Sequence, residues 1–381
     1  MLLNPVIGAM FYIANILRNE YNRMNISLLV LFLALINITI KGSETDYSWY
    51  MPLYSDALKT NLSDYLFSLN RSKEPLYTFA NYILANIFFG NRILFSIFST
   101  SFFYFGIIKG LYSIQRIFQI KKIYLATSVI FLIFFPYIFA NTANVLRQYY
   151  ATSMLLWAIP EILVGNKKFW ILAIASIFVH TSSGLIVLLL AIPLLKKRIT
   201  LINSLYYIAA YLMLKYLSSI ADLLNSIIGN SFLSYALMKA STKTTFETVF
   251  TFEKIVFVSF TTIVPLLLVN ICSSLRKNDL LIRFVNIQFF LYLFLMANLD
   301  QAELCVRMNM YLWCFLPFNL LILISYFKIS KLTCYILSYA VFFFFLTYQL
   351  MLTKNTYYCN DSLLYSSFFS YFVDSKLYLL R

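Results

Sequence analysis

The chain has 381 residues, of which 61% are hydrophobic and 12% are charged, and its mean hydropathy is +0.77. Average soluble domains carry roughly 25% charged residues, so this chain has too few charges to wet the surface of a soluble fold. Its 30 Lys and Arg residues outnumber its 15 Asp and Glu residues, which gives a net charge of +15. On a membrane protein such an excess reports orientation, because cytoplasmic loops collect Lys and Arg, and no nucleic acid is expected as a partner.

The apolar runs predict an all-α fold, a polytopic transmembrane helical bundle that forms one domain over residues 1–381. A hydrocarbon core about 30 Å thick needs about 20 apolar helical residues, and shorter helices are tolerated inside a bundle. Runs this long and without alternation indicate helices, not a closed barrel. About 12 spans (11–13) are expected, near residues 2–17, 26–41, 92–112, 123–141, 146–164, 169–180, 184–195, 201–218, 254–272, 284–299, 308–327 and 332–350.

Residues 75–89 are ambiguous, because they can cross the membrane or lie at its outer surface. If they do not cross, the short cytoplasmic loops hold 16 of the 30 basic residues and three of the 15 acidic ones. If they cross, every later loop inverts and the basic clusters face outward, against the positive-inside rule. We therefore expect a surface or re-entrant helix here, with both termini outside.

Two stretches are too long for turns, residues 42–91 and 219–253, and both are expected on the outer side. Long loops on one face of a helical scaffold are where binding usually occurs. The basic cytoplasmic loops are short and leave no room for a catalytic domain. The sequence therefore places the working face outside.

Metal and nucleotide chemistry have no visible basis in the sequence. The chain has one histidine, and its five cysteines form no CxxC pair. No GxGxxG or Walker loop is present to cradle a nucleotide. We expect no metal site and no cofactor.

The first polar motif follows the second expected span, where residues 42–47 read GSETDY. It places the carboxylates of Glu44 and Asp46 beside the ring of Tyr47. Rings cover the apolar faces of a sugar and carboxylates bind its hydroxyls, so this is a candidate sugar site. The alternative is an interfacial aromatic belt with ordinary loop acids.

The second motif is Glu74 followed by Pro75, Leu76 and Tyr77. Proline in the first helical turn after an acid is typical of a plain helix start, and taken by itself this motif favours that interpretation over a functional one.

The third motif is Asn144, Arg147 and Gln148, at the outer end of the fifth expected span. In one continuous helix these residues and Ala151 share a face. Amide neighbours favour a polar cavity over snorkelling to lipid for Arg147, and its planar fork suits phosphate.

The fourth motif is the apex from His180 to Gly184, between two short apolar segments. Each segment reaches only about 17 Å as a helix, so the apex can lie in a cavity below the outer surface. A lone histidine is commonly structural, but an ionisable group inside a membrane favours function.

The fifth motif is Asp300, Glu303, Arg307 and Tyr311, which fall on one narrow helical stripe. Either Glu303 and Arg307 form an ion pair that stabilises the charged arginine next to lipid, or Arg307 is a second phosphate-binding arginine.

Together, and in this order, these motifs resemble the EpsG-like family of bacterial polysaccharide polymerases. The matching pieces are G-x-x-x-D-Y, E-P-x-Y, N-x-x-R-Q with alanine three residues on, F-x-H-x-S-S and R-x-x-x-Y, spread over about residues 2–330. The family pattern has an arginine shortly before the first glycine, where this chain has Lys41.

The resemblance implies a Wzy-type glycosyltransferase, with O antigen as the first-choice product. Such an enzyme lies in the bacterial inner membrane with its active site facing the periplasm. It joins oligosaccharide repeat units carried on undecaprenyl pyrophosphate, which is both donor and acceptor, and uses no nucleotide donor. Membrane lipid and a chain-length regulator protein are the other implied partners.

The chemistry assigns roles to the motif residues. The leaving pyrophosphate needs cationic groups in the transition state, for which Arg147 and Arg307 are candidates. The acceptor hydroxyl needs a base, either His180 or Asp46, with His180 favoured. The catalytic residues are therefore expected to be His180, Asp46 and Arg147. Substrate binding is expected from Arg307, Gln148, Asn144, Glu44, Tyr47, Glu74 and Tyr311.

Two other classes of protein remain open. A lipid-linked oligosaccharide flippase or transporter would also carry arginines, but along a cavity open to both faces. Here the motifs cluster outside, which favours the polymerase. A membrane O-acyltransferase would want a histidine paired with an acid, and the sequence shows no convincing pair.

Overall fold

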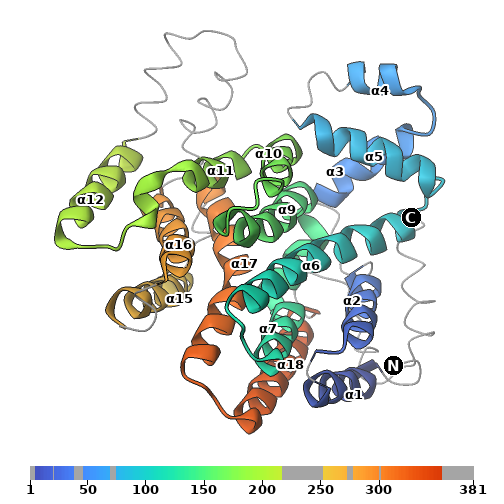
Figure 1. Ribbon diagram of the computed structural model, residues 1–381. Helices are drawn as coiled ribbons and strands as arrows, with labels where there is room; N and C mark the ends of the chain where they lie inside the picture. Colours follow the sequence, from blue (N-terminus) through green and yellow to red (C-terminus); the bar gives the residue numbers. More distant parts are fainter. Residues whose placement is uncertain are drawn as a thin grey trace, which may run out of the picture. The chain divides into compact units, whose positions relative to one another are not determined.

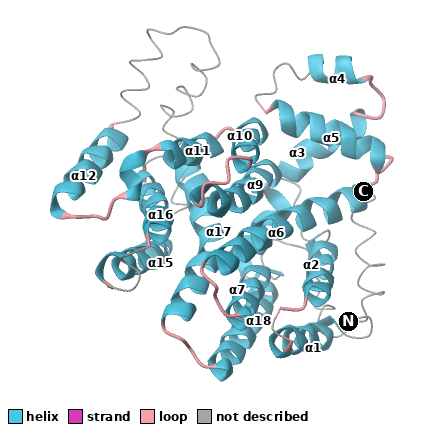
Figure 2. Cartoon of the chain, viewed as in Figure 1, coloured by secondary structure: helices cyan, strands magenta, loops and turns pink. Residues whose placement is uncertain are grey.

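The computed structural model describes residues 5–19, 21–37, 46–68, 74–216, 252–272, 278–299 and 302–353, and these ranges contain helices and no strand (Figures 1 and 2). The all-α prediction is confirmed for them. The chain divides into two compact units. The first comprises residues 1–184 and 317–381, and the second comprises residues 185–316.

The first unit holds the N-terminal helices and the last one. Its helices are α1 (Pro5–Arg18), α2 (Arg23–Asn37), α3 (Asp46–Asp56), α4 (Leu62–Ser68), α5 (Pro75–Ile87), α6 (Arg92–Ile117), α7 (Lys122–Phe134), α8 (Pro136–Asn144), α9 (Leu146–Leu163), α10 (Phe169–Val179) and α18 (Lys331–Thr353). The second unit holds most of α11 (Ser183–Ala191), the short 3₁₀ helix η1 (Pro193–Lys196), α12 (Leu201–Lys215), α15 (Phe252–Ile271) and α16 (Asp279–Ala297). Helix α17 (Ala302–Tyr326) contributes to both units.

The helices are those of a membrane protein. Within the described residues, five helices are long and apolar enough to cross a bilayer, namely α6, α15, α16, α17 and α18. Helices α7 and α8 together make a sixth candidate. Helices α1, α2 and α10 are apolar but shorter. The figure of about 12 spans stays a prediction.

The expected single span over residues 123–141 is wrong in one respect, because it is two helices that meet at a bend of 55°. The break falls at Phe135, which is extended, and α8 begins at Pro136. Proline lacks the N–H that would continue the ladder and pushes the residue before it out of the helical region, which explains the bend.

The predicted loop over residues 42–91 is largely helical where it is described. It contains α3, α4 and α5, and α5 is the helix expected over residues 75–89. At 13 residues α5 is about 20 Å long, which is less than the thickness of the hydrocarbon core, and its surface or re-entrant placement stays a prediction. The second predicted loop, residues 219–253, lies outside the described residues apart from the first turn of α15.

Helices α6 and α9 pack closely because α6 carries glycines four residues apart. A Cβ at Gly106 would lie 1.8 Å from the Ser153 hydroxyl oxygen, and one at Gly110 would lie 2.1 Å from the backbone oxygen of Leu156. The Ser153 hydroxyl donates to backbone carbonyls of α6, at 3.0 Å from Phe102 O. Small residues at this spacing let membrane helices approach to backbone contact.

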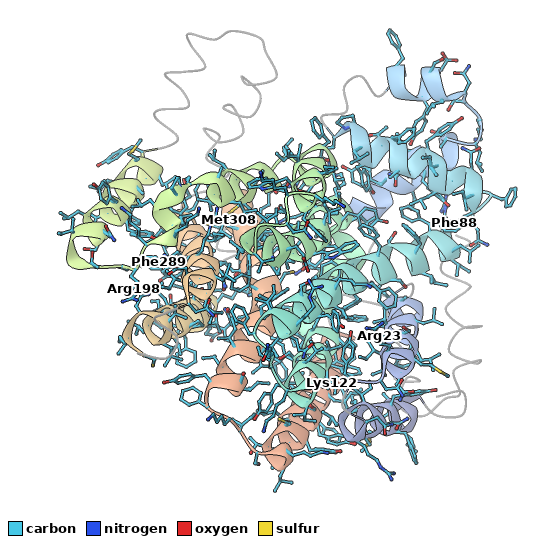
Figure 3. All side chains as sticks on the ribbon, viewed as in Figure 1. Arg23, Phe88, Lys122, Arg198, Phe289 and Met308 are labelled. Carbon is cyan, nitrogen blue, oxygen red and sulfur yellow. The ribbon has the colours of Figure 1, made fainter. Side chains whose placement is uncertain are left out.

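The loops predicted to be cytoplasmic gather at one end of the first unit. The Arg23 guanidinium, at the start of α2, lies 5.3 Å from the centre of the Tyr112 ring in α6. Arg116, at the end of α6, pairs with Glu161 near the end of α9 at 2.5 Å. Tyr124, near the start of α7, donates to the carbonyl of Ile329 at 3.0 Å. Figure 3 shows Arg23 and Lys122 at the starts of α2 and α7.

Candidate functional site

Glu74 stands at the centre of a buried polar cluster in the first unit, where it is 5% exposed. One carboxylate oxygen accepts a hydrogen bond from the Arg147 guanidinium, and the other faces Nδ1 of His180. These partners lie 73 and 106 residues further along the chain. Three residues from three separate sequence motifs therefore meet in one site, which we name the Glu74 cluster (Glu74, Arg147 and His180).

The backbone before α5 places Glu74. The helix begins at Pro75, whose fixed φ suits the first helical position. Glu74 has φ −132° and ψ 68°, outside the helical region as expected for a residue before proline. Its carbonyl accepts from Thr78 N at 3.2 Å, so the residue completes the first turn while its side chain leaves the helix axis. The expected helix start at Pro75 is confirmed, and the same backbone geometry also positions the carboxylate of Glu74.

Arg147 enters the site from the first turn of α9. The expected continuous helix from Asn144 to Ala151 is wrong, because Val145, with φ −120° and ψ 71°, separates α8 from α9. Asn144 ends α8, and its side chain lies outside the described residues. Arg147, Gln148 and Ala151 remain on one helix. The amides of a helix's first turn have no intrahelical partner, so Arg147 lies where an anion is favoured.

The three members differ in access. The side chain of Arg147 is 25% exposed, whereas those of Glu74 and His180 are 6% and 4% exposed. Gln148, also expected to bind substrate, is almost fully buried. An anion that approaches the cluster therefore reaches the guanidinium first.

Tyr50 of α3 covers the guanidinium. Its ring centre lies 4.5 Å from Cζ of Arg147, and its ring meets that of Tyr77 edge-on at 5.4 Å. A cation held over a ring keeps its charge with less water around it. The sequence showed Tyr50 only as a tyrosine after the first motif, and nothing in the local pattern linked it to Arg147.

His180 caps α10 and is fixed by the apex that follows it. The backbone N–H of His180 donates to the carbonyl of Ser176 at 2.9 Å, and its backbone carbonyl accepts from the Ser183 hydroxyl at 2.8 Å. The Ser183 hydroxyl also lies 3.1 Å from that of Ser176. The small hydroxyl residues of the motif thus hold a tight turn, and the turn aims the imidazole at Glu74.

The charge state of Glu74 sets the tautomer of His180. Burial raises the pKa of Glu74, but hydrogen bonds and charges from His180 and Arg147 outweigh burial, so its pKa lies below the usual value. An ionised carboxylate only accepts hydrogen bonds, so the proton lies on Nδ1 of His180. The imidazolium of His180 supplies the charge that lowers the pKa of Glu74, whereas in the neutral ring with its proton on Nδ1 the Nε2 atom carries no proton and can accept one.

An apolar and aromatic core adjoins the Glu74 cluster. It draws on α3, α4, α5, α6, α9 and α10. The Tyr150 ring lies 5.8 Å from that of Tyr77, and its hydroxyl donates to Ser99 at 2.5 Å. Ala151 packs into the same core. Helices from separate parts of the sequence are thus locked together beneath Glu74.

The remaining predicted residues fall elsewhere or outside the described residues. Asp46 and Tyr47 begin α3, but their side chains are not described, and Glu44 lies outside the described residues. Arg307 and Tyr311 lie on α17 in the second unit, with Arg307 partly exposed and Tyr311 buried. Their spacing of four residues puts them on one helix face.

Among the described residues no three His, Cys, Asp or Glu side chains gather as the ligands of a metal ion would. The pairing of His180 with an acid is the feature that sequence reasoning missed. The absence of a visible pair therefore no longer argues against an acyltransferase, and the family assignment must decide that question.

The model of the EpsG family matches residues 23–371, which include every motif residue. Comparisons with curated proteins and with solved structures give no match. The family points to a polysaccharide polymerase of the glycosyltransferase type, which agrees with a membrane protein whose motif residues meet in one buried site. Over nearly its whole length, therefore, this chain belongs to the EpsG family.

Proposed function

We propose that this protein joins oligosaccharide repeat units carried on undecaprenyl pyrophosphate at the periplasmic face of the bacterial inner membrane. O antigen is the product we assign first. The observation that carries the proposal is the Glu74 cluster, in which the carboxylate of Glu74 contacts both the guanidinium of Arg147 and the imidazole of His180. A guanidinium is a group that commonly binds phosphate.

In the proposed reaction the hydroxyl oxygen of the acceptor sugar attacks the anomeric carbon of the donor chain. The bond from that carbon to the pyrophosphate oxygen breaks, and undecaprenyl pyrophosphate leaves with both bonding electrons. The hydroxyl proton passes to Nε2 of His180. The charge that develops on the leaving group is stabilised by Arg147. Because His180 is 4% exposed, the proposal requires that substrate binding opens access to its ring.

Glu74 acts in this scheme through its two partners. It fixes the tautomer of His180 and stabilises the imidazolium that forms when the proton arrives. It also keeps Arg147 in place before substrate binds. The pyrophosphate then offers the guanidinium a second, more highly charged partner.

The other motif residues take supporting roles in the proposal. Glu44, Asp46 and Tyr47 contact the acceptor sugar, and Asp46 is the alternative base. Arg307 and Tyr311, on α17 in the second unit, keep the substrate-binding role expected from their motif. Asn144 and Gln148 keep the substrate-binding role expected from the motif of Arg147. No metal and no nucleotide cofactor takes part.

The proposed topology has about 12 spans, both termini outside, and periplasmic loops at residues 42–91 and 219–253. The positions of Arg147 and Glu161 on α9 support the proposed side of the membrane for the Glu74 cluster. Arg147 lies in its first turn, whereas Glu161, fourteen residues later, pairs with Arg116 at the basic end. At a rise of 1.5 Å per residue these ends are about 21 Å apart. The Glu74 cluster thus faces away from the basic loops, which the positive-inside rule assigns to the cytoplasm.

Arg147→Ala tests the proposal in cells that depend on this chain for their polysaccharide. We expect long chains to disappear while single repeat units are still exported and the variant is inserted at normal levels. The matched control is Arg116→Ala, which removes the other arginine–glutamate pair of the first unit, at the far end of α9. It should leave long chains in place.

Each other outcome refutes the proposal in its own way. Normal chain lengths with Arg147→Ala would remove Arg147 from the reaction. Loss of all exported units would indicate a flippase. Full-length chains that lack an ester would indicate an acyltransferase.

A further inference from the structure

An apolar groove opens beside the Glu74 cluster, between α5 and α10 of the first unit. It encloses about 610 Å³, within the range of about 300–1,000 Å³ that ligand pockets occupy. Its lining is entirely apolar and consists of Pro75, Leu76, Phe79, Ile171, Ile174, Ala175 and Phe178.

The groove lining adjoins the Glu74 cluster along the chain on both helices. Pro75 directly follows Glu74, and Phe178 comes two residues before His180. From Phe178 to Ile171 the lining follows seven residues of α10, which at 1.5 Å per residue is about 10 Å. Glu74, the residue before the first lining residue, holds the partly exposed guanidinium of Arg147. An apolar groove of this length next to such a cluster has the chemistry to bind an amphiphile with an anionic head.

We propose that this groove binds the pyrophosphate-proximal isoprenoid units of the lipid carrier, so that the pyrophosphate lies at Arg147. The inference rests on the proposed function and adds the place of the hydrocarbon chain. It commits to the carrier because the head that the groove delivers to Arg147 must carry negative charge and remain attached to a long hydrocarbon. The walls are open enough to admit a chain from the bilayer, since Phe79 and Ile174 are 38% and 47% exposed.

Ala175 is the residue on which the groove depends. It packs against the core beneath the Glu74 cluster and forms part of the groove lining. A larger side chain there would fill the space that a methyl-branched chain needs, without changing a residue of the cluster. Ala175→Leu is therefore the informative substitution.

The test uses the full-length protein in nanodiscs and a polyprenyl pyrophosphate with a photoreactive group on its isoprene units next to the head. We expect crosslinks to peptides of α5 and α10, which unlabelled polyprenyl pyrophosphate removes and phosphatidylglycerol does not. Ala175→Leu should lower the crosslinking yield at least about tenfold, a factor that corresponds to about 1.4 kcal/mol. Its matched control is Ala209→Leu, at an exposed position of the apolar helix α12, which should leave the yield unchanged.

A second variant guards against misfolding of the first. Phe79→Ala combined with Ile174→Ala removes two exposed groove walls and should weaken crosslinking to a similar degree. Full crosslinking in both variants, or equal competition by phosphatidylglycerol, would overturn the groove assignment. That result would leave the proposed function intact if Arg147→Ala still abolishes long chains, whereas long chains with Arg147→Ala would refute the function itself.

Discussion

Replacing Glu74 by glutamine is the sharpest perturbation of the site. The amide has nearly the same shape as the carboxylate but no charge, and its single acceptor oxygen can serve either Arg147 or His180, not both. Removing one partner from a buried ion pair costs about 3–5 kcal/mol. We expect a loss near the lower limit, about 3 kcal/mol, because Arg147 is 25% exposed and keeps the Tyr50 ring over it.

The effect of Glu74→Gln on the reaction should exceed its effect on stability. Without the carboxylate, the tautomer of His180 is no longer fixed and the imidazolium loses its counter-ion. General acid–base catalysis contributes about 10²–10⁴-fold, so we expect polymerisation to slow by at least about 100-fold. The rate is measured on purified protein from the consumption of lipid-linked repeat units, and the amount of folded protein is measured in the same sample. The pH dependence of the rate should also change, which a purely structural role would not produce.

Glu161→Gln is the matched control for this substitution. Glu161 is also buried and pairs with an arginine at 2.5 Å, but at the other end of α9. It should lower stability and leave the rate per folded molecule unchanged. If Glu74→Gln polymerised at the normal rate per folded molecule, or if both variants lost activity equally, the reasoning about the Glu74 cluster would be refuted.

Three further predictions follow from the same geometry. Arg147→Lys keeps the charge but loses the planar guanidinium that contacts Glu74 and lies over the Tyr50 ring. The rate should therefore fall by about tenfold or more while insertion is normal. A rate equal to that of the unchanged protein would contradict a specific need for the guanidinium. Gly110→Ala places a Cβ 2.1 Å from the backbone oxygen of Leu156. Overpacking of this kind should lower the free energy of unfolding by about 1–3 kcal/mol, measured by thermal unfolding in detergent. An unchanged unfolding temperature would show that α6 and α9 separate easily. The folded-state pKa of Glu74 is lowered from 4.5. The stability that its ionised form contributes is therefore fully present above pH 4.5 and is lost as the pH falls through the folded-state pKa. Unfolding temperatures measured downward from pH 7 should drop on acidification, and they should drop less in the Glu74→Gln variant.

Much of the fold could be predicted because it depends on local sequence. Long apolar runs give helices wherever the backbone must satisfy its own hydrogen bonds, and the boundaries of α6, α9 and α10 follow the expected spans within a few residues. The break at Pro136 was missed, because the proline was read as part of one span. The break at Val145 agrees with the expected spans, which leave residues 142–145 between them, and only the placing of Asn144 on the helix of Arg147 was wrong.

The candidate site could be predicted only as separate pieces. His180, Arg147 and Glu74 were each singled out from their motifs, and the resemblance to the EpsG family is confirmed. Glu74 was nevertheless ranked as a substrate contact at a plain helix start, and Tyr50 was not assigned at all. Their roles depend on contacts with residues far along the chain, which no local pattern contains.

The sequence by itself determined that the chain is an all-α membrane protein of the EpsG family, because composition, hydropathy and motif order are properties of neighbours along the chain. Only the tertiary structure decided that Glu74 joins Arg147 to His180, because these contacts exist only once α5 and α9 each pack against α10. The same packing decided that an apolar groove opens beside the charged cluster. A carboxylate buried between a guanidinium and an imidazole is stable only where the fold brings all three groups together, and the sequence motifs lie too far apart to show that they meet.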